Sequence, residues 1–128
     1  MKNNRKYGAI GEEIASKYLE KGGYSITARN YHFGHIETDI ICEDEKTILF
    51  VEVKTRTDAD FSLKYGRPAS AVTKTKLANM LEGARRYIFE NHITKKPRID
   101  VIEVYLAEIN GIITTSEKGI NHIKNVTG

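Results

Sequence analysis

Apolar positions recur every three or four residues in two long stretches of the chain, and this spacing predicts two helices. The first covers residues 7–21 and ends at Gly22 and Gly23, as glycine commonly does past a helix C-terminus. Glu12 is the acidic residue of this stretch that lies at the margin of the apolar side, where it faces the expected core. The second predicted helix covers residues 70–91.

Segments rich in β-branched and aromatic residues predict the strands. We expect strands over residues 24–29, 36–42, 47–56 and 98–106, and a last hairpin in which 112–115 pairs with 120–124. The short polar turn at 43–46 predicts an antiparallel hairpin between the second and third strands. The order of helix, three strands, helix and further strands predicts a single α/β domain over residues 1–128, with a mixed sheet flanked by helices.

The composition is that of a soluble globular protein, with 40% hydrophobic and 29% charged residues among 128. The single cysteine, Cys42, cannot form an internal disulfide, which favours a reducing compartment. No apolar run is long enough to cross a membrane, and no signal-type segment follows the basic N-terminus. We therefore expect a cytoplasmic protein with no membrane partner.

Positive charge is concentrated in the middle of the chain. Residues 54–98 contain 11 Lys and Arg against 4 Asp and Glu, whereas the whole chain has a net charge of only +3. A basic block of this kind is typical of proteins that bind polyanions such as nucleic acid. A solvated, lysine-rich surface explains the charge equally well.

The strand predicted at 47–56 carries charge on a face that otherwise looks buried. Side chains alternate along a strand, so Glu52 and Lys54 project from the same face. Burying such groups is costly unless they are paired or bind a ligand. The preceding strand places Asp39 next to Glu52 across the hairpin, and two carboxylates this close favour a divalent cation between them.

Phosphodiester hydrolysis is the chemistry that needs this set. Asp39 and Glu52 are expected to hold Mg²⁺ or Mn²⁺, with the backbone carbonyl of Val53 and the carboxylate of Glu12 as further ligands. Lys54 would orient or activate the attacking water, or stabilise charge on the phosphorus. An isolated Glu-x-Lys pair is, however, often no more than a solvated salt bridge.

Several ordered stretches between Gly8 and Val126 resemble the YraN-type family of bacterial proteins, within the PD-(D/E)xK nuclease superfamily. The resemblance implies a restriction-endonuclease-like α/β/α core, and for Glu12, Asp39, Glu52 and Lys54 the roles already described. The matching stretches are Gly8-x-x-Gly11-Glu12-x-x-Ala15, Arg29-Asn30, Glu37-x-Asp39-Ile40-Ile41, Phe50-Val51-Glu52-Val53-Lys54-x-Arg56, Gly66-x-Pro68, Lys76 and Arg98-x-Asp100-Val101.

Five basic residues are candidates for contact with nucleic acid: Arg56, Arg67, Lys74, Lys76 and Arg85. Those on the second helix are equally typical of the charged outer face of an amphipathic helix. Arg67 lies in the predicted loop at 57–69, which is either a clamp for nucleic acid or a surface loop. Lys76 is the strongest candidate because it also belongs to the family pattern.

The sequence thus predicts a metal-dependent endonuclease that cuts structured or damaged DNA in repair, recombination or processing. The alternative is a nucleic-acid-binding protein that keeps the nuclease fold without cutting. A third reading is an accessory subunit that needs a protein partner to present its substrate. A protein that cuts four-way junctions would be expected to form a homodimer.

Overall fold

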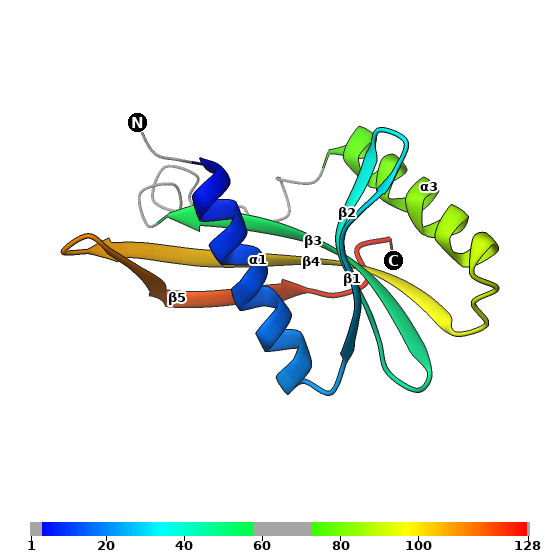
Figure 1. Ribbon diagram of the computed structural model, residues 1–128, viewed down its shortest axis with the longest axis horizontal. Coiled ribbons are helices and arrows are strands. Elements are labelled where there is room, and N and C mark those ends of the chain that lie inside the picture. The colour runs from blue at the N-terminus through cyan, green and yellow to red at the C-terminus, as the bar shows by residue number, and fades with distance from the viewer. Residues whose placement is uncertain (1–3, 58–72, 128) are drawn as a thin grey trace.

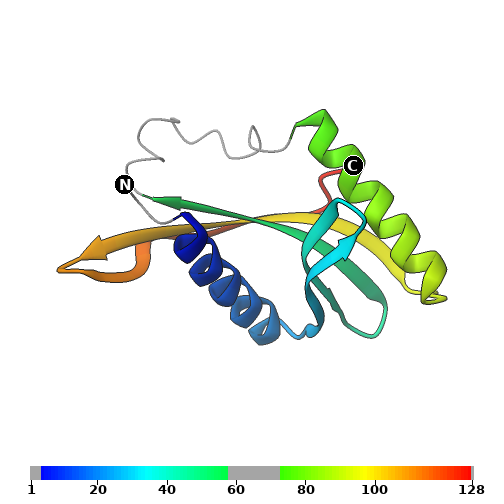
Figure 2. The same cartoon turned by 45° about the horizontal axis from the view of Figure 1, so that its top comes forward.

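The computed structural model describes residues 4–57 and 73–127, and its centre is a mixed sheet of five strands in the order β1-β2-β3-β4-β5 (Figure 1). One helix lies on each face of this sheet, so the described part of the chain has three layers (Figure 2). The elements in chain order are α1 (Asn4–Lys21), β1 (Ser25–Phe33), β2 (Ile36–Glu43), β3 (Thr47–Thr57), α3 (Lys74–Glu90), β4 (Lys96–Ile109) and β5 (Ile112–Ile123). The predicted α/β/α fold class is confirmed.

The strand pairings explain the position of the second helix. β1, β2 and β3 run antiparallel in succession, whereas β3 and β4 run parallel from Thr47 beside Lys96 to Thr57 beside Leu106. Parallel neighbours cannot be joined by a tight turn, and α3 belongs to the crossover between them. β5 returns antiparallel along the other edge of β4.

Each helix covers its own apolar cluster. On the α1 face, Leu19 packs with Val51 and Ile102, and on the α3 face, Met80 packs with Phe50. Alternate residues of β3 therefore enter opposite cores, as the sequence pattern predicts. None of the described helices is both long and apolar enough to cross a membrane.

The predicted element bounds are close to those observed, although β4 covers Lys96–Ile109 rather than residues 98–106. α1 begins at Asn4 rather than at residue 7, and β1 continues to Phe33 rather than ending at residue 29. α3 begins at Lys74, after Thr73 caps its N-terminus by accepting a hydrogen bond from the Lys76 amide. Residues 58–72, which include most of the predicted loop, lie outside the described residues.

The prediction of a final hairpin within residues 112–124 is wrong. Residues Ile112–Ile123 form one strand, β5, that pairs with β4. Asn110 and Gly111 both adopt positive φ and form the two-residue turn between β4 and β5, as Asn-Gly commonly does in hairpins. Gly119 also has positive φ, but it lies within β5, opposite the register shift between Val104 and Leu106. Gly119 therefore marks an irregularity within a strand and not a turn between two strands.

Candidate active site

The candidate site lies where β2 leaves β3. The antiparallel ladder between these strands ends at the pair Ile40–Val51, whereas β3 continues to Thr57 beside β4. Asp39 is the next residue of β2 beyond this ladder, and its Oδ2 accepts a hydrogen bond of 2.8 Å from the backbone amide of Val53. The side chain thus supplies the acceptor that the β2 backbone no longer provides.

The Val53 carbonyl faces the same gap between the strands. The amide and carbonyl of one strand residue point towards the same side, and the Val53 amide points towards Asp39. The described β2–β3 ladder includes no partner for Val53. Its carbonyl is therefore directed towards the region that Asp39 occupies, as a ligand at this site requires.

Glu52 is buried on the α3 face of β3, with 4% of its surface exposed. Two lysines lie against one oxygen of its carboxylate: Lys54 Nζ is 3.4 Å and Lys76 Nζ is 3.2 Å from Glu52 Oε2. Lys54 comes from the same strand, whereas Lys76 reaches over from the first turn of α3. A buried carboxylate needs such partners, because desolvation without them would strongly disfavour its charged form.

The surroundings of Asp39 strongly raise the pKa of its carboxyl group. Burial raises the pKa of Asp39 to about 7, with the nearby charge of Glu52 adding to the effect. The hydrogen bond from the Val53 amide acts in the opposite direction but is outweighed. Asp39 and Glu52 therefore lie close enough, as predicted, for their negative charges to repel each other.

Glu12 approaches the site from α1. Burial raises its pKa, while a hydrogen bond with Asn30 lowers it, and the charge of Glu52 contributes to the increase. The helix can come this close because Gly11 has no side chain, since a Cβ there would lie 2.1 Å from Thr55 Oγ1 on β3. Within residues 4–57 and 73–127, however, no three His, Cys, Asp or Glu side chains converge as a metal-binding cluster.

The candidate contacts with nucleic acid that the structure describes lie on different parts of the molecule. Lys76 joins the site through Glu52, whereas Lys74 is exposed in the same first turn of α3 but on the opposite side of the helix. Arg56 is only 19% exposed at its side chain, and its Nε lies 3.8 Å from Glu103 Oε2 on β4. Arg67 lies outside the described residues.

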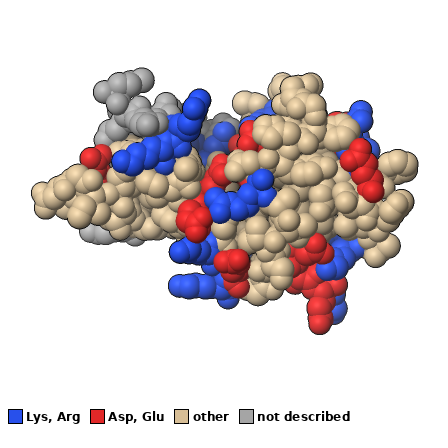
Figure 3. All heavy atoms as spheres, viewed as in Figure 1, with Lys and Arg blue, Asp and Glu red and all other residues tan. Residues whose placement is uncertain are grey.

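Arg85 lies towards the far end of α3. Its guanidinium forms an ion pair of 2.8 Å with Glu82, and it lines a groove with Leu81, Ile88 and Pro97. Charge on the face of the molecule seen in Figure 3 is mixed, with basic and acidic side chains side by side. Among the described residues on this face, the basic side chains do not form a single basic surface.

Two buried acids of β4 were not predicted as parts of a site. Asp100 accepts hydrogen bonds of 2.9 Å from Nε and Nη2 of Arg98, and His122 Nε2 lies 2.7 Å from Asp100 Oδ2. Burial raises the pKa of Asp100, but its hydrogen bonds outweigh this and hold the pKa at about 2. Asp100 is therefore the structural salt-bridge partner that its basic sequence neighbourhood suggests. Glu103 is the one charged residue in the otherwise apolar segment 101–107, and this pattern would have identified it as a buried acid.

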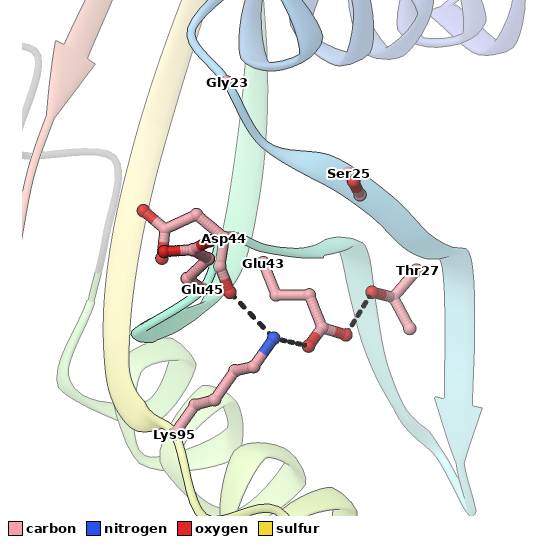
Figure 4. A pocket seen from close by; sticks show the side chains of 7 residues that line it. All are labelled: Gly23, Ser25, Thr27, Glu43, Asp44, Glu45 and Lys95. Carbon is pink, nitrogen blue, oxygen red and sulfur yellow. Dashed lines mark hydrogen bonds and ion pairs between the residues drawn. The ribbon is translucent and has the colours of Figure 1, made fainter.

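A polar pocket of about 460 Å³ lies at the opposite end of the β2–β3 hairpin (Figure 4). Its central carboxylate, Glu43, is held by Lys95 at 2.6 Å and by the Thr27 hydroxyl at 2.7 Å. Lys95 also donates to the Asp44 carbonyl. Lys95 thus neutralises the charge of Glu43, whereas the charges of Asp39 and Glu52 repel each other. The lining residues are Gly23, Ser25, Thr27, Glu43, Asp44, Glu45 and Lys95.

The layers and the site define the class: an α/β/α protein whose central sheet carries two neighbouring acids, with lysines beside one of them, where two strands separate. The chain belongs to the Uncharacterised protein family UPF0102, whose sequence profile matches residues 11–104. It is similar to UPF0102 proteins of Clostridioides difficile (40% identical over 124 residues, 96% of this chain and 97% of the relative) and Caldicellulosiruptor saccharolyticus (41% over 125 residues, 96% and 98%). A further relative is that of Syntrophomonas wolfei (38% over 122 residues, 95% and 97%). The predicted YraN-type family is thereby confirmed.

Proposed function

We propose that this protein is a Mg²⁺- or Mn²⁺-dependent endonuclease of the PD-(D/E)xK type that acts on structured or damaged DNA. One observation carries the proposal: Asp39 and Glu52 are held close enough to repel each other at the point where β2 and β3 separate. A lysine two residues after Glu52 lies beside its carboxylate. This is the combination that metal-assisted phosphodiester hydrolysis requires.

The donors suit Mg²⁺ better than a metal that needs a complete protein cage. Mg²⁺ keeps several waters and is usually bound by one or two carboxylates together with substrate phosphates. Asp39 and Glu52 would hold it, with the Val53 carbonyl as a third oxygen and Glu12 acting directly or through water. The absence of a three-acid cluster among the described residues is compatible with such a site. When bound, the ion would polarise the phosphate and lower the pKa of a water.

The protein's own residues would orient the reaction. In hydrolysis, the water oxygen forms a bond to phosphorus and loses a proton to solvent, while the phosphorus–oxygen bond to the leaving strand breaks and the leaving oxygen takes up a proton from solvent. Lys54, whose ammonium lies 3.4 Å from the Glu52 carboxylate, would orient that water or stabilise the negative charge that builds on the phosphoryl oxygens. Glu12 is half-buried, so its carboxylate would lie at the edge of the site and leave the site open to substrate.

A second candidate is a nucleic-acid-binding protein that keeps the fold but does not cut. Its support is the neutralisation of Glu52 by two lysines, since a carboxylate already paired in this way does not need a metal. The two candidates differ in one measurable respect. Only the enzyme needs the acidic charges, whereas a binding protein would bind DNA equally well or better without them.

The test is cleavage of branched, nicked and single-stranded DNA with Mn²⁺ or Mg²⁺, comparing the wild type with Glu52→Gln. Glu43→Gln is the matched control, because it neutralises an acid at the other end of the same hairpin. We expect cleavage by the wild type and the control and at least a hundredfold loss in Glu52→Gln, on the order of one major transition-state contact. Equal cleavage by all three proteins would refute the site. DNA binding without cleavage or Mn²⁺ binding in the wild type would favour the second candidate.

A further inference from the structure

The ammonium of Lys76 takes the place of a cation at Glu52. Its Nζ lies 3.2 Å from Glu52 Oε2, the same oxygen that Lys54 approaches at 3.4 Å. A single carboxylate oxygen with two ammonium groups beside it has more positive charge than it needs for neutrality. One of the two lysines is therefore available for another role, and the fold indicates which one.

Lys76 is the partner that can leave without moving the backbone. Its side chain is 40% exposed, against 29% for that of Lys54. Lys54 lies within the paired part of β3, whereas Lys76 lies in the first turn of α3, which Thr73 caps. A lysine has a flexible four-carbon stem, so a change of rotamer carries its ammonium from Glu52 into solvent.

We propose that Lys76 is an internal counter-ion that competes with the metal for Glu52. Entry of the metal displaces its ammonium, which then becomes available to a phosphate of the nucleic acid. This inference rests on the proposed metal site and adds a form of regulation to it. Lys76 reduces the metal affinity of the free protein, and metal binding strengthens the contact with the polyanion. Lys76 is a positioning residue in this scheme.

The first experiment is a calorimetric titration of Mn²⁺ into the wild type, Lys76→Met and Lys76→Arg at low salt. Lys76→Met should bind Mn²⁺ about fivefold more tightly than the wild type, which corresponds to ~1 kcal/mol. Lys76→Arg keeps the positive charge and should stay within about twofold of the wild type. Lys74→Met is the matched control, since Lys74 lies in the same turn, is exposed and forms no ion pair with the described residues.

The outcomes separate this inference from the proposed function. Mn²⁺ binding that is equal or weaker in Lys76→Met than in the wild type would overturn the competition while leaving the metal site intact. Binding in neither protein would overturn the metal site, and the competition with it. Binding that appears only in Lys76→Met would support both, because the counter-ion would then be the barrier to the metal.

Release of Lys76 to phosphate is tested without metal, by fluorescence anisotropy of a labelled duplex in EDTA. Glu52→Gln removes the charge that holds Lys76, so we expect it to bind DNA severalfold more tightly than the wild type. Adding Lys76→Met should weaken DNA binding more in the Glu52→Gln background than in the wild type. Equal effects in both backgrounds would show that Lys76 does not pass from the carboxylate to the phosphate.

Discussion

The stability of the metal-free protein should fall as the pH rises from about 5 to about 8, with Asp39 as a principal cause. Burial, followed by the charge of Glu52, raises the pKa of Asp39 from 3.8 to about 7 in the folded protein. Between the unfolded pKa of 3.8 and the folded pKa of about 7, the unfolded chain has lost its proton whereas the folded protein still holds one. Raising the pH through about 7 therefore removes stability, and below the unfolded pKa the contribution is fully present.

The size of the effect follows from the shift. A difference between 3.8 and about 7 corresponds to about 4 kcal/mol at 1.36 kcal/mol per pKa unit. Asp39 is only partly buried, so solvent screening reduces this figure, and we expect a loss of about 1–3 kcal/mol. Asp39→Asn keeps an oxygen that can accept the hydrogen bond from Val53 but carries no charge.

The assay is urea unfolding of the wild type and Asp39→Asn in EDTA at several pH values between about 5 and about 8. The difference in unfolding free energy between the two proteins isolates Asp39, because Glu12, whose pKa is also raised, is present in both. The wild type should lose stability relative to Asp39→Asn as the pH rises. Curves that run parallel throughout would refute the reasoning, since Asp39 would then be neither buried with nor repelled by Glu52.

Two further predictions concern the packing of α1 on the sheet and the buried carboxylate of Asp100. In thermal unfolding, Gly11→Ala should destabilise the protein by about 1–3 kcal/mol, because the added Cβ would overlap Thr55. Gly8→Ala should be neutral or stabilising by up to about 1 kcal/mol, because nothing lies within 4 Å of the added Cβ. Equal effects of the two alanines would argue against close packing of α1 on β3. Asp100→Asn should cost about 3 kcal/mol at pH 7 by weakening its bonds with Arg98. The difference from the wild type should shrink as the pH falls from about 4 to about 2, since the folded pKa of Asp100 is about 2, and acid unfolding curves that differ equally at every pH would contradict this.

The part of the site that depends on one strand is predictable from sequence. Alternation along β3 is fixed by backbone geometry, so Leu49, Val51 and Val53 had to enter one core and Glu52 and Lys54 the opposite face. The hairpin with β2 follows from its short polar turn. These local rules hold whatever the rest of the chain does, and the structure agrees with them.

Contacts that depend on how whole elements pack are not predictable in the same way. The sequence indicates Lys76 as a phosphate contact, but its ion pair with Glu52 depends on where α3 crosses the sheet. That position depends on Gly83, where an added Cβ would lie 3.2 Å from Ile36 on β2. The predicted hairpin within residues 112–124 is wrong for a similar reason: that these residues continue as one strand depends on their pairing with β4.

The charge of Asp39 is the feature that a purely structural role does not explain. Its hydrogen bond to the Val53 amide replaces the main-chain acceptor lost where β2 leaves β3, and an asparagine oxygen would accept the same bond. An asparagine would also avoid the repulsion from Glu52 and the desolvation that raises the pKa. The metal-free protein therefore bears a free-energy cost for a carboxylate at this position. A cation shared by Asp39 and Glu52 would turn that cost into binding energy, which is why the retained charge supports a metal site more strongly than the hydrogen bond does.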